Sequence, residues 1–469
     1  MLNRDDPLSS NSPRGKQGKR DYSRLKVAAV SLGCSKNRVD TEEVLGRLAE
    51  WGCQLIEDCS MADIVVVNTC GFIEDAQQES IDTLLEVAAS GKKDQKIVVA
   101  GCLVEVFGDK LLKTMPEINA AIGVHSYKNL DRMIEALINE KRICIMDRPG
   151  HDYEELSQRV LTEPPHSVNV KIAEGCSNRC RYCLIPKIRG PFRSRPPGAI
   201  INEVKSLVQK GTREICLIAQ DTTSYGKDKE EFPDLEGLIK RIMTEVDQHF
   251  WLRIMYTYPS RITDGLITLI AEENRICNYL DIPIQHASDR VLEAMGRPYR
   301  RRDLDLLLQK LRSAIPDLAI RTTCMVGYPG ESISDFRELL EFVSDNRLEK
   351  LGAFSYSAQK GTTAYSLSGQ VPKRVSKKRL QKLMLTQQEI ALKENMKLCG
   401  RIFSIMVDQP SGSAGWYYGR SCFQAPGVDG GIYFHSKEQL FPGQLIKGRI
   451  FAASPYNLLA VAQNTAGQG

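Results

Sequence analysis

Three cysteines lie close together in the stretch EGCSNRCRYCLIPKIRGPFRSR, residues 174–195. They are Cys176, Cys180 and Cys183, with the spacing Cys-x3-Cys-x2-Cys. Structural zinc needs a fourth Cys or His ligand, and the neighbouring sequence offers none. Three thiolates on a four-iron cube leave one iron open, and an open iron can bind a small molecule. The pattern therefore favours an iron–sulfur cluster over zinc, with a substrate such as S-adenosylmethionine as the missing ligand.

Three further cysteines each lie at the end of a predicted buried strand. Cys34, Cys70 and Cys102 end the buried-strand patterns KVAAVSLGC, ADIVVVNTC and KIVVAGC, and a helical pattern follows each of them. Loops that follow parallel strands open at the same edge of a sheet, so these cysteines can converge. For a single cysteine, a buried structural thiol is the simpler interpretation. Three in the same position favour a second three-cysteine cluster.

The remaining cysteines show no such position, and we interpret them as packing residues. They are Cys53, Cys59, Cys144, Cys216, Cys277, Cys324, Cys399 and Cys422.

Alternating strand and helix patterns must position these cysteines. Over residues 25–147 the alternation predicts a parallel α/β domain. A Pro-containing linker follows over residues 148–166. Residues 167–371 carry six strand patterns with helices between them, which predicts a partial (β/α)6 barrel rather than a full eight-unit one. The loop of Cys176 follows the first of these strands, at the rim where such barrels carry active sites.

Three other segments complete the chain. Residues 1–24 predict a disordered basic tail. Residues 372–397 predict one long basic helix, more simply a solvated connecting helix than a binding surface. Short strands and glycine turns over residues 398–466 predict a small β-barrel. The predicted fold class is therefore α/β, followed by a small all-β domain.

Length and composition exclude several classes of protein. The 469 residues suggest roughly two to four domains, and 42% hydrophobic with 26% charged residues is ordinary for globular proteins. A net charge of +5 neither indicates nor excludes nucleic-acid binding. The polar N-terminus does not resemble a signal peptide, and no apolar run has the length of a membrane span. We therefore expect a cytoplasmic protein with reduced thiols, no disulfides and no membrane contact.

The motif CSNRCRYC resembles the signature of the radical S-adenosylmethionine superfamily. In that superfamily the aromatic residue before the third cysteine, here Tyr182, lies near the adenine of the cofactor. The chain from about Lys26 to Gln463 resembles the methylthiotransferases, which have an N-terminal cluster domain, a radical S-adenosylmethionine barrel and a C-terminal TRAM domain. The resemblance implies two [4Fe-4S] clusters, held by Cys34, Cys70 and Cys102 and by Cys176, Cys180 and Cys183.

Several stretches are similar to the RimO branch of this family, which methylthiolates an aspartate in the twelfth protein of the small ribosomal subunit. In one of them His286 stands where the tRNA-modifying branch usually has a serine. The stretches are CLIPKIRGPFRSR, LIAQDTTSYG, DIPIQHAS, RTTCMVGYPGE, FSYSAQKGTTAY and GRSCFQAPGVDG.

A tRNA (adenosine) methylthiotransferase of the MiaB type is the alternative. From residue 398 onward the chain has five basic and three acidic side chains, few for a domain that must hold RNA phosphates. This balance leans slightly towards a protein substrate.

The resemblance implies radical chemistry. The β-carbon of an aspartate has no usefully acidic hydrogen, so acid–base catalysis cannot start the reaction, and we assign no catalytic side chain. The hypothesis is that the cluster on Cys176, Cys180 and Cys183 reduces S-adenosylmethionine to a 5′-deoxyadenosyl radical, which removes a hydrogen from the β-carbon. The carbon radical then takes sulfur from the other cluster, methylated by a second S-adenosylmethionine. This implies an electron donor such as flavodoxin or ferredoxin, and either the free ribosomal protein or the assembled subunit as partner.

Other rim residues carry weaker signals. Gln220 ends the second barrel strand, and we expect it to contact the cofactor, although a solvated rim side chain is an equal alternative. Gly327 lies in VGYPGE, a region that approaches the adenosine in the superfamily, and it could equally be a turn residue. Three arginines near the second cysteine motif could pair with a carboxylate of cofactor or substrate, or form surface ion pairs. They are Arg189, Arg193 and Arg195.

Overall fold

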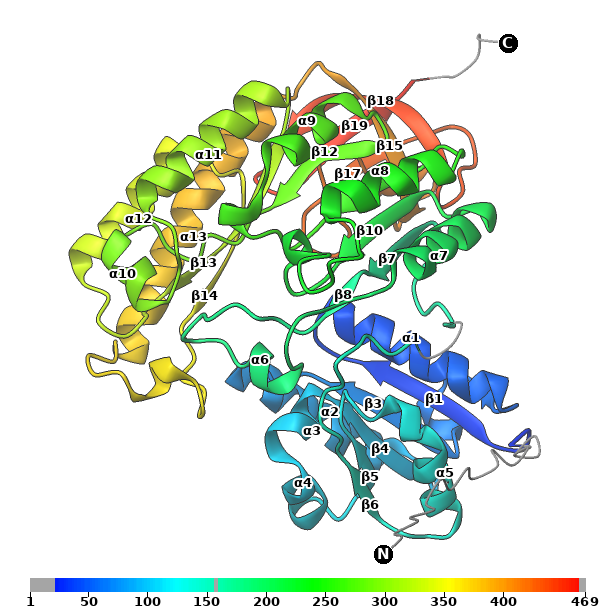
Figure 1. Ribbon diagram of the computed structural model, residues 1–469. Helices are drawn as coiled ribbons and strands as arrows, with labels where there is room; N and C mark the ends of the chain where they lie inside the picture. Colours follow the sequence, from blue (N-terminus) through cyan, green and yellow to red (C-terminus); the bar gives the residue numbers. More distant parts are fainter. Residues whose placement is uncertain (1–21, 156–158, 464–469) are drawn as a thin grey trace, which may run out of the picture.

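The structure is a computed structural model that describes residues 22–155 and 159–463 (Figure 1). The predicted tail lies outside the described residues up to residue 21. Its last part was predicted wrongly, because Tyr22 already belongs to the fold. The backbone N–H of Tyr22 donates to the carbonyl of Trp51 at 3.1 Å, and the two rings meet edge-on.

The N-terminal unit is a six-stranded parallel sheet with strand order β2-β1-β3-β4-β5-β6. Its strands are β1 (Lys26–Ser31), β2 (Gln54–Leu55), β3 (Ile64–Thr69), β4 (Lys96–Gly101), β5 (Ile118–Ile122) and β6 (Ile143–Ile145). Its helices are α1 (Ser35–Glu50), α2 (Glu74–Ser90), α3 (Cys102–Phe107), α4 (Asp109–Thr114) and α5 (Leu130–Ile138). The helical pattern that follows Cys102 is divided between two helices, because Gly108 adopts a positive φ of 53° between α3 and α4.

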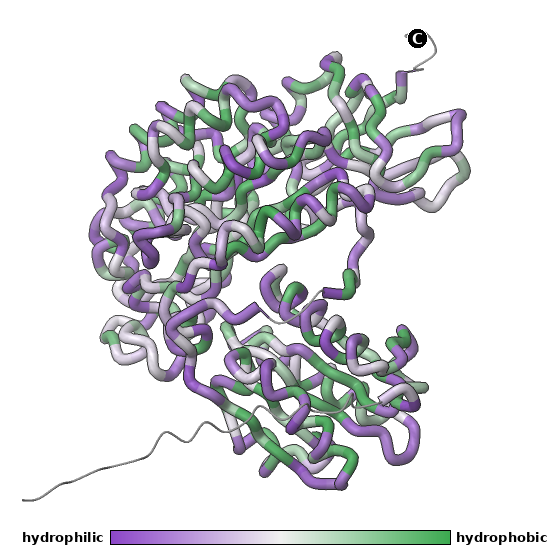
Figure 2. The backbone as a smooth tube through the Cα atoms, turned by 45° about the vertical axis from the view of Figure 1, so that its right-hand side comes forward, coloured by the Kyte–Doolittle hydropathy of each residue, from purple (hydrophilic) through white to green (hydrophobic). Residues whose placement is uncertain are grey.

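Helices cover both faces of this sheet, which explains why its strands are continuous hydrophobic runs. On one face Val66 packs with Val44 and Leu48 of α1. On the other face Val65 packs with Leu84 of α2. Figure 2 shows the central strands of both α/β units as mainly hydrophobic, whereas the surrounding helices alternate hydrophobic and hydrophilic residues.

The second unit confirms the predicted partial (β/α)6 barrel. Six parallel strands have the order β14-β13-β12-β11-β10-β7. They are β7 (Ser167–Lys171), β10 (Glu214–Ile218), β11 (Trp251–Ile254), β12 (Ile276–Asp281), β13 (Ala319–Val326) and β14 (Lys350–Ser355). The helices between them are α7 (Pro197–Gln209), α8 (Leu235–Glu245), α9 (Asp264–Glu272), α10 (Asp289–Ala294), α11 (Arg301–Ala314) and α12 (Ile333–Asp345).

The long helix α13 (Lys373–Met396) is more than the solvated connection that the sequence suggested. It packs along β14 and α12, with Leu383 and Ala391 fully buried. Arg379 donates to the carboxylate of Glu331 at 2.8 Å. The buried positions recur every three to four residues, a helical stripe that the many lysines on the other face obscure in the sequence.

The C-terminal unit is the predicted small β-barrel. Its strands close in the order β15-β16-β17-β19-β18. They are β15 (Ile402–Pro410), β16 (Trp416–Arg420), β17 (Ile432–His435), β18 (Leu445–Ala453) and β19 (Leu458–Ala462). Among the residues that the structure describes, no helix is long and apolar enough to cross a membrane.

This barrel contacts one layer of side chains from the partial barrel. Glu214 of β10 accepts from Arg253 of β11 at 2.9 Å and pairs with Arg420 of β16 at 2.8 Å. Tyr279 of β12 donates to Asp429 at 2.8 Å. Neighbouring parallel strands thus present one polar layer, which fixes the C-terminal unit to the sheet.

The ion cluster around Glu214 leads to a prediction about stability. Burial raises the pKa of Glu214, but Arg420 and Arg253 outweigh it and lower the pKa from 4.5 to about 2. The stabilisation is therefore present above pH 4.5 and is lost as the pH falls towards 2. Glu214→Gln should destabilise the protein by about 3 kcal/mol at pH 7, because it leaves two buried guanidiniums short of a negative charge.

Urea unfolding of the cluster-free protein measures this effect. The difference between wild type and Glu214→Gln should shrink as the pH falls, since protonation makes the two side chains alike. Glu245→Gln, which removes an exposed ion pair with Arg241, is the control and should change stability by less than about 0.5 kcal/mol. Equal effects of the two substitutions at pH 7 would contradict this role for Glu214.

Candidate functional site

The first triad (Cys34, Cys70 and Cys102) lies at the C-terminal edge of the N-terminal sheet. Cys34 precedes α1, Cys70 follows β3 and Cys102 opens α3. The Oδ1 atom of Asn37 lies 3.9 Å from the Sγ of Cys34 and 3.6 Å from the Sγ of Cys102. Gly33 leaves room for Cys70, because a Cβ at Gly33 would lie 2.8 Å from the Cβ of Cys70. The structure therefore brings together the three cysteines that the sequence placed at equivalent strand ends.

The second triad (Cys176, Cys180 and Cys183) lies in a loop at the rim of the partial barrel. The loop is closed by β8 (Ala173–Glu174) and β9 (Arg193–Ser194), which pair antiparallel. Within it, the N–H of Cys183 donates to the carbonyl of Cys180 at 3.1 Å. The N–H of Ile185 donates to the Sγ of Cys183 at 3.4 Å. These contacts hold the second triad in one compact turn.

The two triads lie near the same contact between the N-terminal unit and the partial barrel. Cys102 of the first triad packs against Leu184, the residue directly after Cys183, and against Ile188 of the short helix α6 (Ile185–Ile188). Figure 1 shows α6 between the N-terminal sheet and the partial barrel. Cys102 thus links the first triad to the loop that carries the second triad.

The side chain of Arg189 joins the loops of both triads. It is 1% exposed and donates to Asn37 at 2.6 Å and to Asp40 of α1 at 2.8 Å. Its other guanidinium nitrogen donates to both carboxylate oxygens of Glu174 at 3.0 Å, two residues before Cys176. One guanidinium thus fixes the helix that follows Cys34 relative to the strand that precedes Cys176.

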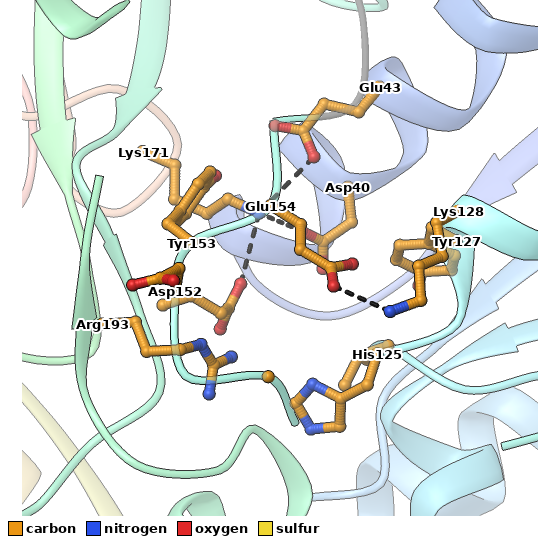
Figure 3. Close-up of a pocket in the computed structure, with 13 residues that line it drawn as sticks. Asp40, Glu43, His125, Tyr127, Lys128, Asp152, Tyr153, Glu154, Lys171 and Arg193 are labelled. Atoms are coloured by element: carbon orange, nitrogen blue, oxygen red, sulfur yellow. Dashed lines mark hydrogen bonds and ion pairs between the residues drawn. The ribbon is translucent and has the colours of Figure 1, made fainter. Parts of the chain in front are cut away.

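Lys171 of β7 forms further ion pairs at the same contact between the two domains. Its ammonium lies 2.5 Å from Asp40, 3.6 Å from Glu43 and 3.2 Å from Glu174. Figure 3 shows Lys171, Asp40 and Glu43 beside Tyr153 and Glu154 of the linker, around a small polar pocket. Because each carboxylate and lysine there has an opposite charge beside it, we interpret this pocket as part of the domain contact.

The three arginines of the cysteine loop follow neither predicted role. Arg189 is buried between the domains, Arg195 pairs with Glu155 and Glu203, and Arg193 donates to backbone carbonyls. All three are less than one-tenth exposed. They are structural groups inside the protein, neither free for a ligand nor part of surface ion pairs, because the linker and α1 cover them.

The thiols differ in their electrostatic environment. Burial raises the pKa of Cys102 and Cys183 to about 12 and that of Cys176 to about 11. At Cys34 the surrounding protein also raises the pKa, but the charges of Lys36 and Arg189 outweigh it and lower the value. A metal group must displace the protons of the buried thiols, so its binding compensates for their burial.

The donor set fits iron–sulfur clusters better than single metal ions. Structural zinc takes four Cys or His ligands, whereas each triad supplies three thiols. In a four-iron cube each thiolate binds a different iron, so the sulfurs stay apart. Each triad also has sulfur as its sole donor type, and three ligands leave a fourth iron open for another molecule.

Tyr182 lies beside a guanidinium that the sequence analysis missed. Arg297 donates to the Tyr182 hydroxyl at 2.5 Å and lies 4.8 Å from the ring centroid of Tyr258. Its Nε atom is buried without a hydrogen-bond partner, and no carboxylate in the described residues forms an ion pair with it. The Cys180 thiol is close enough to contribute to the raised pKa of the Arg297 guanidinium. An unpaired cation beside the second triad indicates a place for an anionic group.

The other predicted cofactor residues are placed differently. Gln220 donates to Glu174 at 3.0 Å, and its Oε1 atom is buried and free to accept a hydrogen bond. Gly327 needs its positive φ of 75° and its missing Cβ for packing, because a Cβ there would meet Ser376 of α13. His286 is fully buried, and its Nδ1 atom accepts the N–H of Ser288. Cofactor contact by Tyr182, Gln220 and Gly327 stays a prediction.

Sequence reasoning also missed Asn37 and Lys36. Both are less than one-tenth exposed in the first turn of α1. The available signal was their position directly after Cys34, where two polar residues precede the apolar stripe of the helix.

All fourteen cysteines are described as free thiols. Outside the triads, Cys53, Cys216, Cys277 and Cys324 are buried, as packing residues should be. Cys399 is exposed and was interpreted wrongly, because it lies in the short connection after α13.

Comparison with known families matches all three units. Residues 26–123 match the model described as uncharacterized protein family UPF0004. Residues 170–343 match the Radical SAM superfamily, and residues 399–462 match the TRAM domain. Together with the second triad at the rim of a partial barrel, these matches define a radical S-adenosylmethionine enzyme.

Similar proteins with curated names identify the family. The chain is 41% identical over 437 residues to "Ribosomal protein uS12 methylthiotransferase RimO" of Pelotomaculum thermopropionicum, covering 92% of this chain and 98% of the relative. It is 42% identical over 439 residues to the protein of that name from Citrifermentans bemidjiense, covering 92% and 97%. The chain belongs to this family of methylthiotransferases.

A solved structure supports the fold alone. The radical S-adenosylmethionine methyltransferase TsrM from Kitasatospora setae matches with a TM-score of 0.54 and 12% identity. The match covers 83% of this chain and 79% of that one.

The two triads lead to a prediction about iron. Cys176→Ala and Cys102→Ala should each lower the iron content of the reconstituted protein by about four atoms, because one triad can no longer hold its cube. Cys176→Ala should abolish reductive cleavage of S-adenosylmethionine, whereas Cys102→Ala should retain it. Iron analysis and detection of 5′-deoxyadenosine measure the two effects.

Cys399→Ala is the matched control, because this exposed thiol lies outside both triads. It should leave iron content and cofactor cleavage unchanged. A Cys176→Ala protein that still cleaves S-adenosylmethionine reductively would contradict the assignment of the second triad.

Proposed function

We propose that the enzyme adds a methylthio group to the β-carbon of an aspartate in ribosomal protein uS12, using S-adenosylmethionine and two [4Fe-4S] clusters. The packing of Cys102 against Leu184 is the observation that carries the proposal, because it supports two three-thiol sites near the same contact between domains. One site can serve radical formation and the other can hold the sulfur to be transferred. The names of the relatives support uS12 as substrate and do not favour the alternative of a MiaB-type tRNA enzyme.

When bound, the clusters and S-adenosylmethionine supply reductive cleavage of a carbon–sulfur bond, hydrogen removal from an unactivated carbon and a sulfur for transfer. The chain itself supplies position. Arg189 and Lys171 fix α1 on β7, and the loop closed by β8 and β9 fixes the second triad. The distance between the two sites is thereby set before a substrate arrives.

Side chains beside the second triad would bind S-adenosylmethionine. Tyr182 offers its ring to the adenine, and the free Oε1 atom of Gln220 can accept from the amino group. The unpaired guanidinium of Arg297 suits the carboxylate of the methionine part. We further expect the enzyme to work in the cytoplasm with a flavodoxin or ferredoxin as electron donor, on free uS12 or on the assembled small subunit.

Mass spectrometry after anaerobic incubation with reductant and S-adenosylmethionine tests the function. Reconstituted enzyme should add a methylthio mass to one aspartate-containing peptide of uS12 and leave tRNA unchanged, and the Cys102→Ala protein is the control without transfer. A gain on tRNA adenosine alone would contradict the proposed substrate and leave the two-site chemistry in place.

Arg297→Met tests the cofactor contacts. Removing the cation should weaken S-adenosylmethionine binding to the reconstituted enzyme about 30-fold or more, because the cofactor's carboxylate would lose a charged partner worth about 2 kcal/mol or more. Equilibrium dialysis under anaerobic conditions measures the dissociation constant. Arg302→Met removes an exposed guanidinium nearby and should leave it unchanged. Unchanged affinity in Arg297→Met would exclude the carboxylate contact.

A further inference from the structure

Lys36 is a buried cation in the first turn of α1. It is 7% exposed, and its ammonium lies 3.3 Å from the ring centroid of Tyr256. Among the described residues, no ion pair includes Lys36. A buried ammonium without an anion costs several kcal/mol, and a cation–π contact recovers only about 2 kcal/mol of it. Within the described chain the Cys34 thiolate contributes negative charge beside Lys36 but would be bound to a cluster, so an anion from outside can still serve as the partner of Lys36.

Three other cations around this space already have carboxylate partners. Arg189 pairs with Asp40 and Glu174, and Arg261 pairs with Asp221 at 2.5 Å. Lys171 is likewise surrounded by three carboxylates. Arg297 is unpaired but lies beside Tyr182 and the second triad, where the cofactor is expected. Lys36 is thus a buried cation beside the first triad that forms no ion pair with a carboxylate of the described residues.

One carboxylate of the barrel faces Lys36 and must be considered. Asp281 at the end of β12 is close enough for the charge of Lys36 to lower the pKa of its carboxyl group. Among the described residues, however, no ion pair joins the two side chains. The Oδ2 atom of Asp281 instead accepts the N–H of Tyr256 at 3.1 Å, and its Oδ1 atom lies 3.9 Å from Arg321. Asp281 therefore positions the Tyr256 backbone, and among the described residues it forms no ion pair with Lys36.

Lys36 lies close to Cys34 of the first triad in the sequence and against the rim of the partial barrel in space. Lys36 follows Cys34 of the first triad by two residues, and Tyr256 follows β11 at the rim of the barrel. The hydroxyl groups of Ser35 and Tyr256 meet at 3.2 Å, so two hydroxyls border the ammonium. Tyr256 has a positive φ of 59°, an uncommon conformation for an aromatic residue, and it brings the ring under the ammonium.

We propose that Lys36 binds the side-chain carboxylate of the aspartate that the enzyme modifies. This proposal rests on the proposed function, which identifies an aspartate as the target. The β-carbon is bonded directly to the carboxylate carbon. A cation between the first triad and the barrel rim therefore holds the β-carbon between the sulfur site and the cofactor site. Lys36 is a specificity-determining residue, because a neutral target side chain would leave it unpaired.

Binding of two forms of uS12 to the reconstituted holoenzyme tests the proposal. One form carries the aspartate that the mass-spectrometric experiment identifies, and the other carries asparagine at that position. Wild type should bind the aspartate form at least about tenfold more tightly, which corresponds to about 1.4 kcal/mol. Lys36→Met, of similar length and without charge, should bind both forms within about twofold of each other. Lys36→Arg should restore a preference for aspartate.

Iron content and the electron paramagnetic resonance spectrum of each variant separate substrate binding from support of the first triad. We expect both to be unchanged in Lys36→Met, and Lys205→Met on the exposed face of α7 should behave as wild type. An undiminished preference for aspartate in Lys36→Met would overturn the proposal. Loss of iron with that preference retained would also overturn it and make Lys36 a counter-ion of the first triad. A wild type that binds neither form would overturn the proposed function itself.

Discussion

The bond network of Arg189 is the interaction on which the rest of the site depends. Its guanidinium, 1% exposed, joins Asn37 and Asp40 in one domain to Glu174 in the other. Buried charges are tolerated only where opposite charges and hydrogen bonds satisfy them, so this contact has a narrow set of allowed geometries. Because Asn37 borders the first triad and Glu174 precedes the second, that geometry also sets the separation of the two cysteine sites.

The two neighbouring units cover the open sheet of the partial barrel at its two ends. The partial barrel has an open concave side, and the C-terminal barrel covers one end of it through Glu214, Arg253 and Tyr279. Helix α1 covers the other end, where Val39 joins the apolar cluster that includes Ile218 and Met255. The sheet is therefore closed by its neighbours where a full barrel would close on itself. The cysteine sites lie where the N-terminal unit meets the strand ends.

Sequence reasoning succeeded where a residue's role follows from its own strand or motif. Cys34, Cys70 and Cys102 converge because parallel strands end at one edge, a rule that needs no knowledge of other domains. It failed where the role depends on contacts between units. The loop arginines resembled ligand or surface groups because Asp40, which pairs with Arg189, lies 149 residues away. For the same reason the buried stripe of α13 was hidden, since β14 and α12 determine which of its faces is covered.

The distribution of charge shows why two ligands must act together. Around the two triads Arg189, Lys171 and Arg261 have carboxylate partners within the described chain, whereas Lys36 and Arg297 form no ion pair there. Lys36 lies beside Cys34 of the first triad, and Arg297 lies beside Cys180 of the second triad. An enzyme without ligands keeps both charges uncompensated, which is unfavourable in a site of low dielectric constant. Anionic groups arriving at the two positions remove that penalty, so the free energy of binding also fixes the reacting atoms between the sulfur site and the radical site.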